Sequence, residues 1–202
     1  MIIVVSPTDI LPNETNHLNA MFDNGLDLFH FRKYGLEDQL ALNYISKVND
    51  KYRKMIVLHS HHHLANKLEI ERLHFNSETR HSNKHIELTD NYFISTSTHS
   101  IHEFNELNSR WSYAFLSPTY QSISKPGYGK SGTVLPEIKY RKNYQVDLIG
   151  LGGINYQNME TVLNNNVAGI ALMGAVWNQS NPASYLLACK QKEIMWKEKI
   201  NL

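Results

Sequence analysis

Short apolar runs rich in β-branched and aromatic residues alternate along the chain with longer segments in which apolar residues have helical spacing. The runs occupy residues 2–6, 27–31, 55–59, 72–75, 92–95, 113–117, 147–151 and 169–173. Between the first two of them, Leu18, Met21 and Phe22 fall on one face of a helix. The pattern predicts eight strands that alternate with helices.

Alternation of this kind over the whole chain is typical of a parallel sheet that is covered on both faces. Eight units favour a closed barrel over a doubly wound sheet, which more usually has about five or six strands. Ser100 and Glu103 form a capping-box pattern before Phe104, as expected at the start of one of the helices. We therefore predict an α/β protein, a (β/α)8 TIM barrel, in which residues 1–202 form a single domain.

Charge and cysteine content exclude several classes of function. The chain has 20 Lys and Arg against 19 Asp and Glu, and this net charge of +1 gives no field that would hold a nucleic acid. The single cysteine, Cys189, cannot form an intramolecular disulfide and suits a reducing compartment. The first apolar run is too short for a signal peptide, and no later run could cross a membrane. We predict a cytoplasmic protein without nucleic-acid or membrane partners, and a homo-oligomer is left open.

Two strand ends that contain glycine predict a phosphate site. Residues 148–154 lead from a strand into the paired Gly152 and Gly153, and residues 169–174 end a later strand at Gly174. Paired glycines let backbone N–H groups approach an anion, and a short helix after Gly174 would direct its amides to the same point. In (β/α)8 barrels the loops after strands seven and eight form the usual phosphate site. The alternative is that these glycines only make tight turns.

Residues 118–133 are predicted to form a long, mobile sixth loop. We expect its Lys125 and Lys130 to close over an anionic ligand. The Gly-Lys-Ser sequence at 129–131 is not a nucleotide P-loop, because Ser124 stands where that motif requires its first glycine.

With these features in place, the chain resembles the thiamine phosphate synthase superfamily, which includes the TenI-type thiazole tautomerases, from end to end. The resemblance is carried in order by Phe-His-Phe-Arg-Lys at 29–33, Leu-His-Phe at 73–75, Ser-Thr-Ser-Thr-His at 95–99, Ser-Pro-Thr-Tyr at 117–120 with Ser-Lys at 124–125, Gly-Leu-Gly-Gly-Ile at 150–154 and Ala-Leu-Met-Gly-Ala at 171–175. It implies a transferase of thiamine biosynthesis that joins a thiazole phosphate to a pyrimidine diphosphate. In that reaction a pyrimidine methyl cation forms as diphosphate departs, and the thiazole nitrogen captures the cation.

The resemblance also assigns roles to single residues. Arg32, Ser97 and Lys125 would contact the diphosphate, and the amides of Gly153, Met173 and Gly174 would hold the thiazole phosphate. The other residues that we expect to bind ligand are His30, His59, Pro118 and Gly152.

Two departures from the family pattern leave the reaction open. Synthases bind Mg2+ through an Asn-Asp pair after strand three and an Asp after strand four, but this chain has His59, Ser60 and Thr79 there. The resemblance thus implies a bound Mg2+, although the usual Asp ligands are missing. Glu78 is the one alternative ligand. Tautomerases have a histidine after strand six, where this chain has Pro118. Synthase, tautomerase and non-catalytic binding protein remain the alternatives.

Seven of the 11 histidines fall at or near the ends of strands two to five: His30, His59, His61, His62, His63, His74 and His99. An imidazole titrates near neutral pH, so it could move a proton between ligand carbon and nitrogen. His74 and His99 are our candidates for this catalytic role, and the alternative is that they are structural. We interpret 61–63 as a solvated loop or helix start. No spacing here matches a recognised metal signature, so we predict no bound transition metal.

Overall fold

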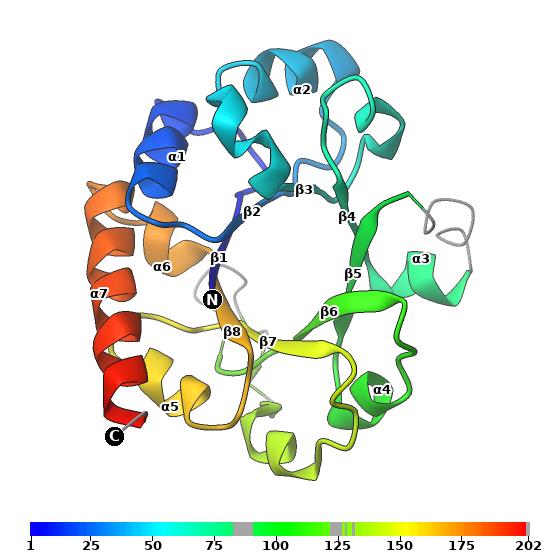
Figure 1. The fold of residues 1–202 in the computed structure, drawn as a ribbon, viewed down its shortest axis with the longest axis vertical. Helices are drawn as coiled ribbons and strands as arrows, with labels where there is room; N and C mark the ends of the chain where they lie inside the picture. Colours follow the sequence, from blue (N-terminus) through cyan, green and yellow to red (C-terminus); the bar gives the residue numbers. More distant parts are fainter. Residues whose placement is uncertain (83–90, 122–126, 128, 131, 201–202) are drawn as a thin grey trace.

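The computed structural model describes residues 1–82, 91–121, 127, 129–130 and 132–200 of the chain, and in this part eight parallel strands close into a barrel (Figure 1). Each strand pairs with its sequence neighbours, and β1 pairs with β8 to close the ring. The strands are β1 (Ile2–Val5), β2 (Leu28–Phe31), β3 (Ile56–Leu58), β4 (Arg72–Phe75), β5 (Phe93–Thr98), β6 (Trp111–Leu116), β7 (Asp147–Leu151) and β8 (Gly169–Leu172). The predicted TIM barrel is confirmed.

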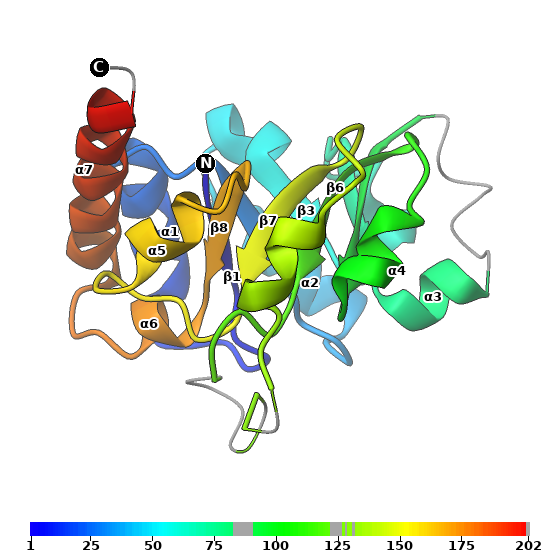
Figure 2. The ribbon, with the colours of Figure 1, turned by 90° about the horizontal axis from the view of Figure 1, so that it is seen from below.

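Helices surround the barrel and cover the outer faces of the strands (Figure 2). The α-helices are α1 (Glu14–Asp23), α2 (Asp38–Ile45), α3 (Ser77–His81), α4 (Ile101–Asn105), α5 (Met159–Leu163), α6 (Gly174–Trp177) and α7 (Pro182–Ile200). The 3-10 helices within the described residues are η1 (Asp50–Met55), η2 (His62–Leu64) and η4 (Leu135–Tyr140). In the described residues no helix is both long and apolar enough to cross a membrane.

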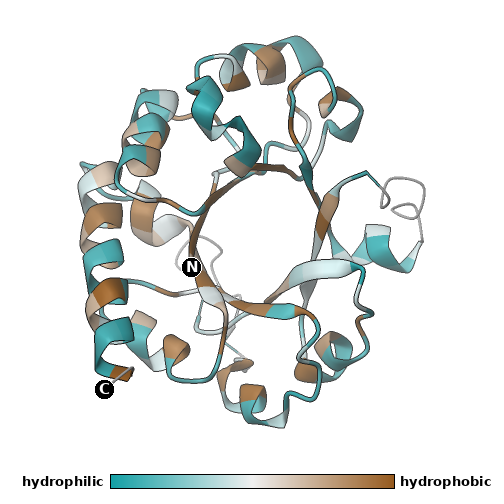
Figure 3. Cartoon of the chain, in the orientation of Figure 1, coloured by the Kyte–Doolittle hydropathy of each residue, from teal (hydrophilic) through white to brown (hydrophobic). Residues whose placement is uncertain are grey.

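The core has two layers because side chains alternate along each strand. On β1, Ile2 and Val4 pack against the helices, whereas Ile3 and Val5 belong to a smaller cluster inside the barrel with Tyr113. Figure 3 shows the strands as a mostly hydrophobic ring and the hydrophilic positions largely on the surrounding helices. The same alternation directs His30 and His74 into the interior, where they are buried among the apolar residues.

Candidate active site

A cavity of about 270 Å³ lies at the carboxyl ends of the strands. In Figure 2 this is the end that carries α6, opposite the N terminus. Every strand contributes a lining residue from its last positions or immediately after them: Val5, Arg32, His59, His74, Ser97, Phe115, Leu151 and Ala171. Active sites of (β/α)8 barrels are built at this end, so the cavity is the candidate site.

The predicted phosphate residues come together on one side of the cavity. Gly152, Gly153, Met173 and Gly174 all line it, together with Ala175. Gly174 and Ala175 begin α6, so their N–H groups have no acceptor within the helix. Within the described part of the chain, the N–H groups of Gly153, Gly174 and Ala175 donate to no other protein group. These amides can therefore hold an anion at the point where the sequence predicts one.

The two glycines of the β7 loop are also required by packing. Gly152 and Gly153 have φ angles of 101° and 64°, and a Cβ added at Gly153 would lie 2.3 Å from the Gln121 carbonyl oxygen. The loop lies against the segment after β6, because the Tyr120 N–H donates to the Gly152 carbonyl at 2.9 Å. A side chain at Gly153 would thus meet the protein backbone.

Pro118, predicted to bind ligand, lies behind Gly152 instead of lining the cavity. A Cβ on Gly152 would be 3.1 Å from the Pro118 Cα. The role of Pro118 in the structure is therefore to support the glycine loop. Lys125 lies outside the described residues, and Lys130 is exposed and does not line the cavity.

Arg32 lines the cavity on the side formed by β2. Its backbone N–H donates to the Ser6 hydroxyl at 2.8 Å, its guanidinium reaches the Thr8 hydroxyl at 3.4 Å, and the guanidinium carbon lies 5.4 Å from the Tyr34 ring centroid. Among the described residues Arg32 forms no ion pair with a carboxylate. Its charge therefore remains available to an anionic ligand. Its neighbour Lys33 points away and is buried in an ion pair with Glu14.

The imidazole rings of His30, His59 and His74 lie together at the floor of the cavity. His30 is fully buried; its Nδ1 is hydrogen-bonded to His59 Nε2 at 2.7 Å, and its Nε2 to the Tyr113 hydroxyl at 2.6 Å. The His59 ring stacks on the His74 ring with centroids 4.1 Å apart. His59 and His74 line the cavity, whereas His30 lies below them and does not. The ligand contact predicted for His30 is therefore indirect, through His59.

Burial keeps the three imidazoles neutral, because a charged ring would lose its hydration there. Desolvation, followed by repulsion from neighbouring imidazoles and cations, lowers the pKa of His30 and of His59 well below the usual range. Desolvation with charges at His62 and Arg32 lowers the pKa of His74 to about 3. At neutral pH these rings can accept or donate a hydrogen bond but carry no charge.

The low pKa values predict that acid destabilises the metal-free protein. The unfolded chain protonates each histidine near pH 6.5, but folded His74 stays neutral down to pH 3 or so. Between these values the unfolded state binds more protons than the folded state. Each such imidazole therefore lowers the unfolding free energy by about 1.4 kcal/mol for every unit by which the pH is lowered. Urea denaturation between pH 6.5 and 5, above the range of most carboxyl groups, measures this slope. In His74→Gln the slope of the unfolding free energy against pH should be smaller by the contribution of one proton. A slope equal to that of the wild type would argue against a neutral His74.

The other candidate histidines lie either in the segment after β3 or at the cavity. The His61 side chain is 7% exposed and that of His63 is 63% exposed, so the interpretation of a solvated segment holds for His63 and is wrong for His61. The ring nitrogens of His61 and His62 are bonded to the carbonyls of Leu36 at 2.7 Å and Leu58 at 3.1 Å, and His63 is bonded to Asp38. None of residues 61–63 lines the cavity, and η2 begins at His62, as the helix-start interpretation predicts. His99 does line the cavity. Its catalytic role stays a prediction.

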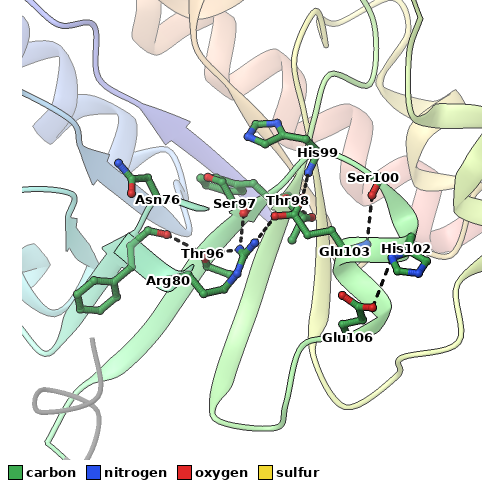
Figure 4. A network of polar contacts seen from close by, with 12 residues as sticks. Asn76, Arg80, Thr96, Ser97, Thr98, His99, Ser100, His102, Glu103 and Glu106 are labelled. Atoms are coloured by element: carbon green, nitrogen blue, oxygen red, sulfur yellow. Dashed lines mark hydrogen bonds and ion pairs between the residues drawn. The ribbon is translucent and has the colours of Figure 1, made fainter. Parts of the chain in front are cut away.

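A partly buried ion pair that the sequence did not reveal holds the end of β5 (Figure 4). Arg80, from α3, donates to the Thr96 hydroxyl at 2.9 Å and the Ser97 carbonyl at 2.6 Å, and pairs with Glu103. Glu103 in turn accepts the His99 N–H at 2.6 Å. Half of the predicted capping box is confirmed, since Ser100 accepts the Glu103 N–H, whereas the Glu103 carboxylate binds the N–H of His99 in place of that of Ser100. This network fixes the two cavity residues of β5 and its loop.

The site does not fit the Mg2+ ion that the family resemblance implies. Among the described residues that line the cavity there are three histidines and one arginine but no carboxylate. Ser60 is bonded to His61, Thr79 lies within α3, and Glu78 is exposed; none of the three lines the cavity. Mg2+ is usually anchored by one or two carboxylates, so these residues do not provide its site.

Comparison with known proteins agrees with the sequence resemblance. The family model of thiamine monophosphate synthase matches residues 1–176. The thiamine-phosphate synthase of Bacillus velezensis is 21% identical over 168 residues, which cover 79% of this chain and 75% of the relative. Crystal structures of thiamine phosphate pyrophosphorylase share the fold: that from Bacteroides thetaiotaomicron has a TM-score of 0.75 at 22% identity, covering 94% of this chain and 95% of that one. The structure from Pyrococcus furiosus has a TM-score of 0.79 at 16% identity, covering 94% and 93%. Because the family model spans most of the chain, this protein belongs to the thiamine monophosphate synthase family.

Proposed function

We propose that the cavity binds a thiazole phosphate at the glycine loops and joins it to a pyrimidine diphosphate, releasing inorganic diphosphate. The main observation in support is that, among the described residues, the amides of Gly153, Gly174 and Ala175 have no protein acceptor. These residues line the same cavity as Arg32. One ligand would thus have its phosphate at β7 and β8, and a second its anionic group at β2. Two phosphorylated substrates fit this arrangement better than one.

In this reaction the bond between the pyrimidine methylene carbon and the diphosphate oxygen breaks, and a bond from that carbon to the thiazole nitrogen forms. The departing diphosphate takes the electron pair and needs cationic or hydrogen-bonding partners. Arg32 supplies a charge, and Ser97 and His99 supply further polar groups that line the same cavity. Without a carboxylate-bound Mg2+, we expect the departure of diphosphate to be slow.

The test is to incubate the purified protein with both substrates and to follow thiamine phosphate by chromatography. We expect slow formation of thiamine phosphate, and no stimulation when Mg2+ is added to the chelated protein. Absence of product under all metal conditions would refute the proposed synthase activity. Fast formation that EDTA abolishes and Mg2+ restores would instead return Glu78 to consideration as a ligand.

A second candidate is tautomerisation of a thiazole carboxylate phosphate, and the position of two histidines at the cavity favours it. His74 and His99 both line the cavity, so an imidazole is in place to accept a proton from ligand carbon. Burial lowers the pKa of His74 to about 3, which makes that ring a weak base. This reaction needs no pyrimidine substrate and no Mg2+. This candidate would be supported if the wild type isomerises the ligand and His74→Gln or His99→Gln abolishes the reaction. If both variants isomerise it at the wild-type rate, neither residue is the base.

Arg32→Ala should weaken binding of inorganic diphosphate by about 1.5–3 kcal/mol, because it removes charge-assisted hydrogen bonds to the anion. Isothermal titration calorimetry measures the change. Arg110→Ala is the matched control, since Arg110 is exposed and does not line the cavity. If Arg32→Ala binds diphosphate as tightly as the control does, Arg32 is a structural residue that only caps the end of β2.

A further inference from the structure

The histidine cluster brings together three possible metal ligands that lie far apart in the sequence. His30 belongs to β2, His59 follows β3, and His74 belongs to β4, so they come from three adjacent strands of the barrel. One ring nitrogen of each lies within 4.8 Å of those of the other two. All three side chains are buried, and rigid strands hold their backbones. The arrangement is thus one built site rather than a collection of surface histidines.

We propose that His30, His59 and His74 bind one divalent transition metal ion of the zinc type at the floor of the cavity. Imidazole nitrogen is a preferred ligand of Zn2+, Co2+ and Ni2+, whereas Mg2+ prefers oxygen. Three histidines with an open fourth position are the ligand set of a catalytic zinc site. His59 and His74 line the cavity, so the open position would face a bound ligand.

The present geometry needs only small ring movements to accept the ion. Zn–N bonds of about 2.0–2.1 Å place tetrahedral nitrogens roughly 3.4 Å apart. His30 Nδ1 and His59 Nε2 are now hydrogen-bonded at 2.7 Å, and the ion would replace the proton between them. The separation of the three nitrogens, at most 4.8 Å, would have to shorten. We expect side-chain rotation to supply both changes.

Each imidazole also has a polar partner on its second nitrogen, as metal-bound histidines do. His30 Nε2 is bonded to the Tyr113 hydroxyl at 2.6 Å, which leaves Nδ1 for the ion. His59 Nδ1 lies 3.5 Å from the Tyr34 hydroxyl, which leaves Nε2. These two nitrogens face each other at 2.7 Å in the cluster.

The third ring is oriented in the same way by serine side chains. The Ser95 hydroxyl donates to the Leu73 carbonyl at 3.3 Å, so its oxygen accepts the His74 Nδ1–H at 2.9 Å. His74 Nε2 then keeps its lone pair, and at present it accepts from the Ser97 hydroxyl at 3.0 Å. Ser97 lines the cavity, so this nitrogen is on the accessible side of the ring.

Three neutral ligands would leave the ion with its full double charge. In a buried site that charge would attract an anion, such as a phosphate or diphosphate oxygen, to the open position. The proposal stands independently of the proposed reaction, because metal binding can be measured without substrates.

Titration of the untagged, metal-stripped protein with Co2+ tests the proposal by visible absorption. We expect saturation at one Co2+ per chain with the intense bands of a four- or five-coordinate ion. Zn2+ should displace the Co2+, and a large excess of Mg2+ should not. Weak bands of six-coordinate Co2+ without saturation at one equivalent would overturn the proposal.

Matched variants locate the ion. His59→Asn and His30→Gln should each weaken Co2+ binding at least about 100-fold, since losing a direct ligand costs no less than losing an outer-shell partner. His63→Gln, on the surface, and His99→Gln, at the cavity but outside the cluster, are the controls and should bind as the wild type does. Circular dichroism checks that each variant is folded. Loss of binding in a control variant but not in the cluster variants would overturn the assignment.

Discussion

Glu14→Ala is expected to lower the unfolding free energy by about 3–5 kcal/mol, the cost of leaving a buried charge without its partner. Lys33 Nζ lies 2.9 Å from Glu14 Oε1, and the two side chains are 0% and 1% exposed. The ammonium also donates to the carbonyls of Pro7 at 3.0 Å and Asp9 at 2.8 Å, but these carry no full charge. Burial lowers the Lys33 pKa, and Glu14 opposes this. Removing Glu14 leaves the ammonium in a space that water does not reach.

Urea denaturation followed by circular dichroism measures this loss. Glu71→Ala is the matched control, because Glu71 pairs with Lys54 at 3.1 Å on the surface, with side chains 49% and 75% exposed. Exposed pairs contribute about 0–1 kcal/mol, so the control should unfold almost as the wild type does. The double variant Glu14→Leu with Lys33→Met should recover stability relative to Glu14→Ala. If Glu14→Ala is as stable as the control, the Lys33 ammonium is hydrated in the variant or has lost its proton.

Gly153→Val should abolish measurable thiazole-phosphate binding. The Cβ would lie 2.3 Å from the Gln121 carbonyl oxygen and 2.7 Å from Tyr120 Cβ, so the β7 loop must move away from the segment after β6. Moving the loop withdraws the Gly153 amide and disturbs the alignment with Gly174. Two charge-assisted hydrogen bonds of about 1.5–3 kcal/mol each would be lost, which predicts at least about 3 kcal/mol weaker binding.

The control for this variant separates backbone strain from crowding. Gly35 has a φ of 78° but a Cβ there would meet nothing within 4 Å. Gly35→Ala should therefore cost about 1 kcal/mol of stability and leave phosphate binding unchanged. Calorimetry with thiazole phosphate compares the two variants. Normal affinity in a folded Gly153→Val protein would remove the phosphate site from this loop.

Most of the fold could be predicted because its signals are local. Each strand is a short apolar run, and the observed bounds differ from the predicted runs by only a few residues at either end. Burial on both faces keeps such runs continuous, so they stand out from the helices. The Ser100 cap is similarly readable, because both of its partners lie within one turn. The two glycine loops were found for the same reason.

The polar interior could not be predicted because its contacts join distant segments. His30, His59 and His74 are separated by 29 and 15 residues, and no short motif has that spacing. They meet only because strands pair in a particular register, with His30 opposite Val57 and His74 opposite Ser95. The ion pair of Arg80 with Glu103 likewise depends on the packing of α3 beside β5. Local sequence describes which residues are polar but not which of them meet.

The closure of the barrel constrains how the chain can be synthesised and folded. β1 is translated long before β8, yet β8 is its partner on one side, with Ile3 opposite Ala171. Until β8 emerges, the backbone groups on that side of β1 remain unpaired, and such an edge can recruit other strands. Pairing across so long a loop also slows folding. Refolding yield should therefore decline at high protein concentration, and a nascent chain would close its native barrel only after β8 has been translated.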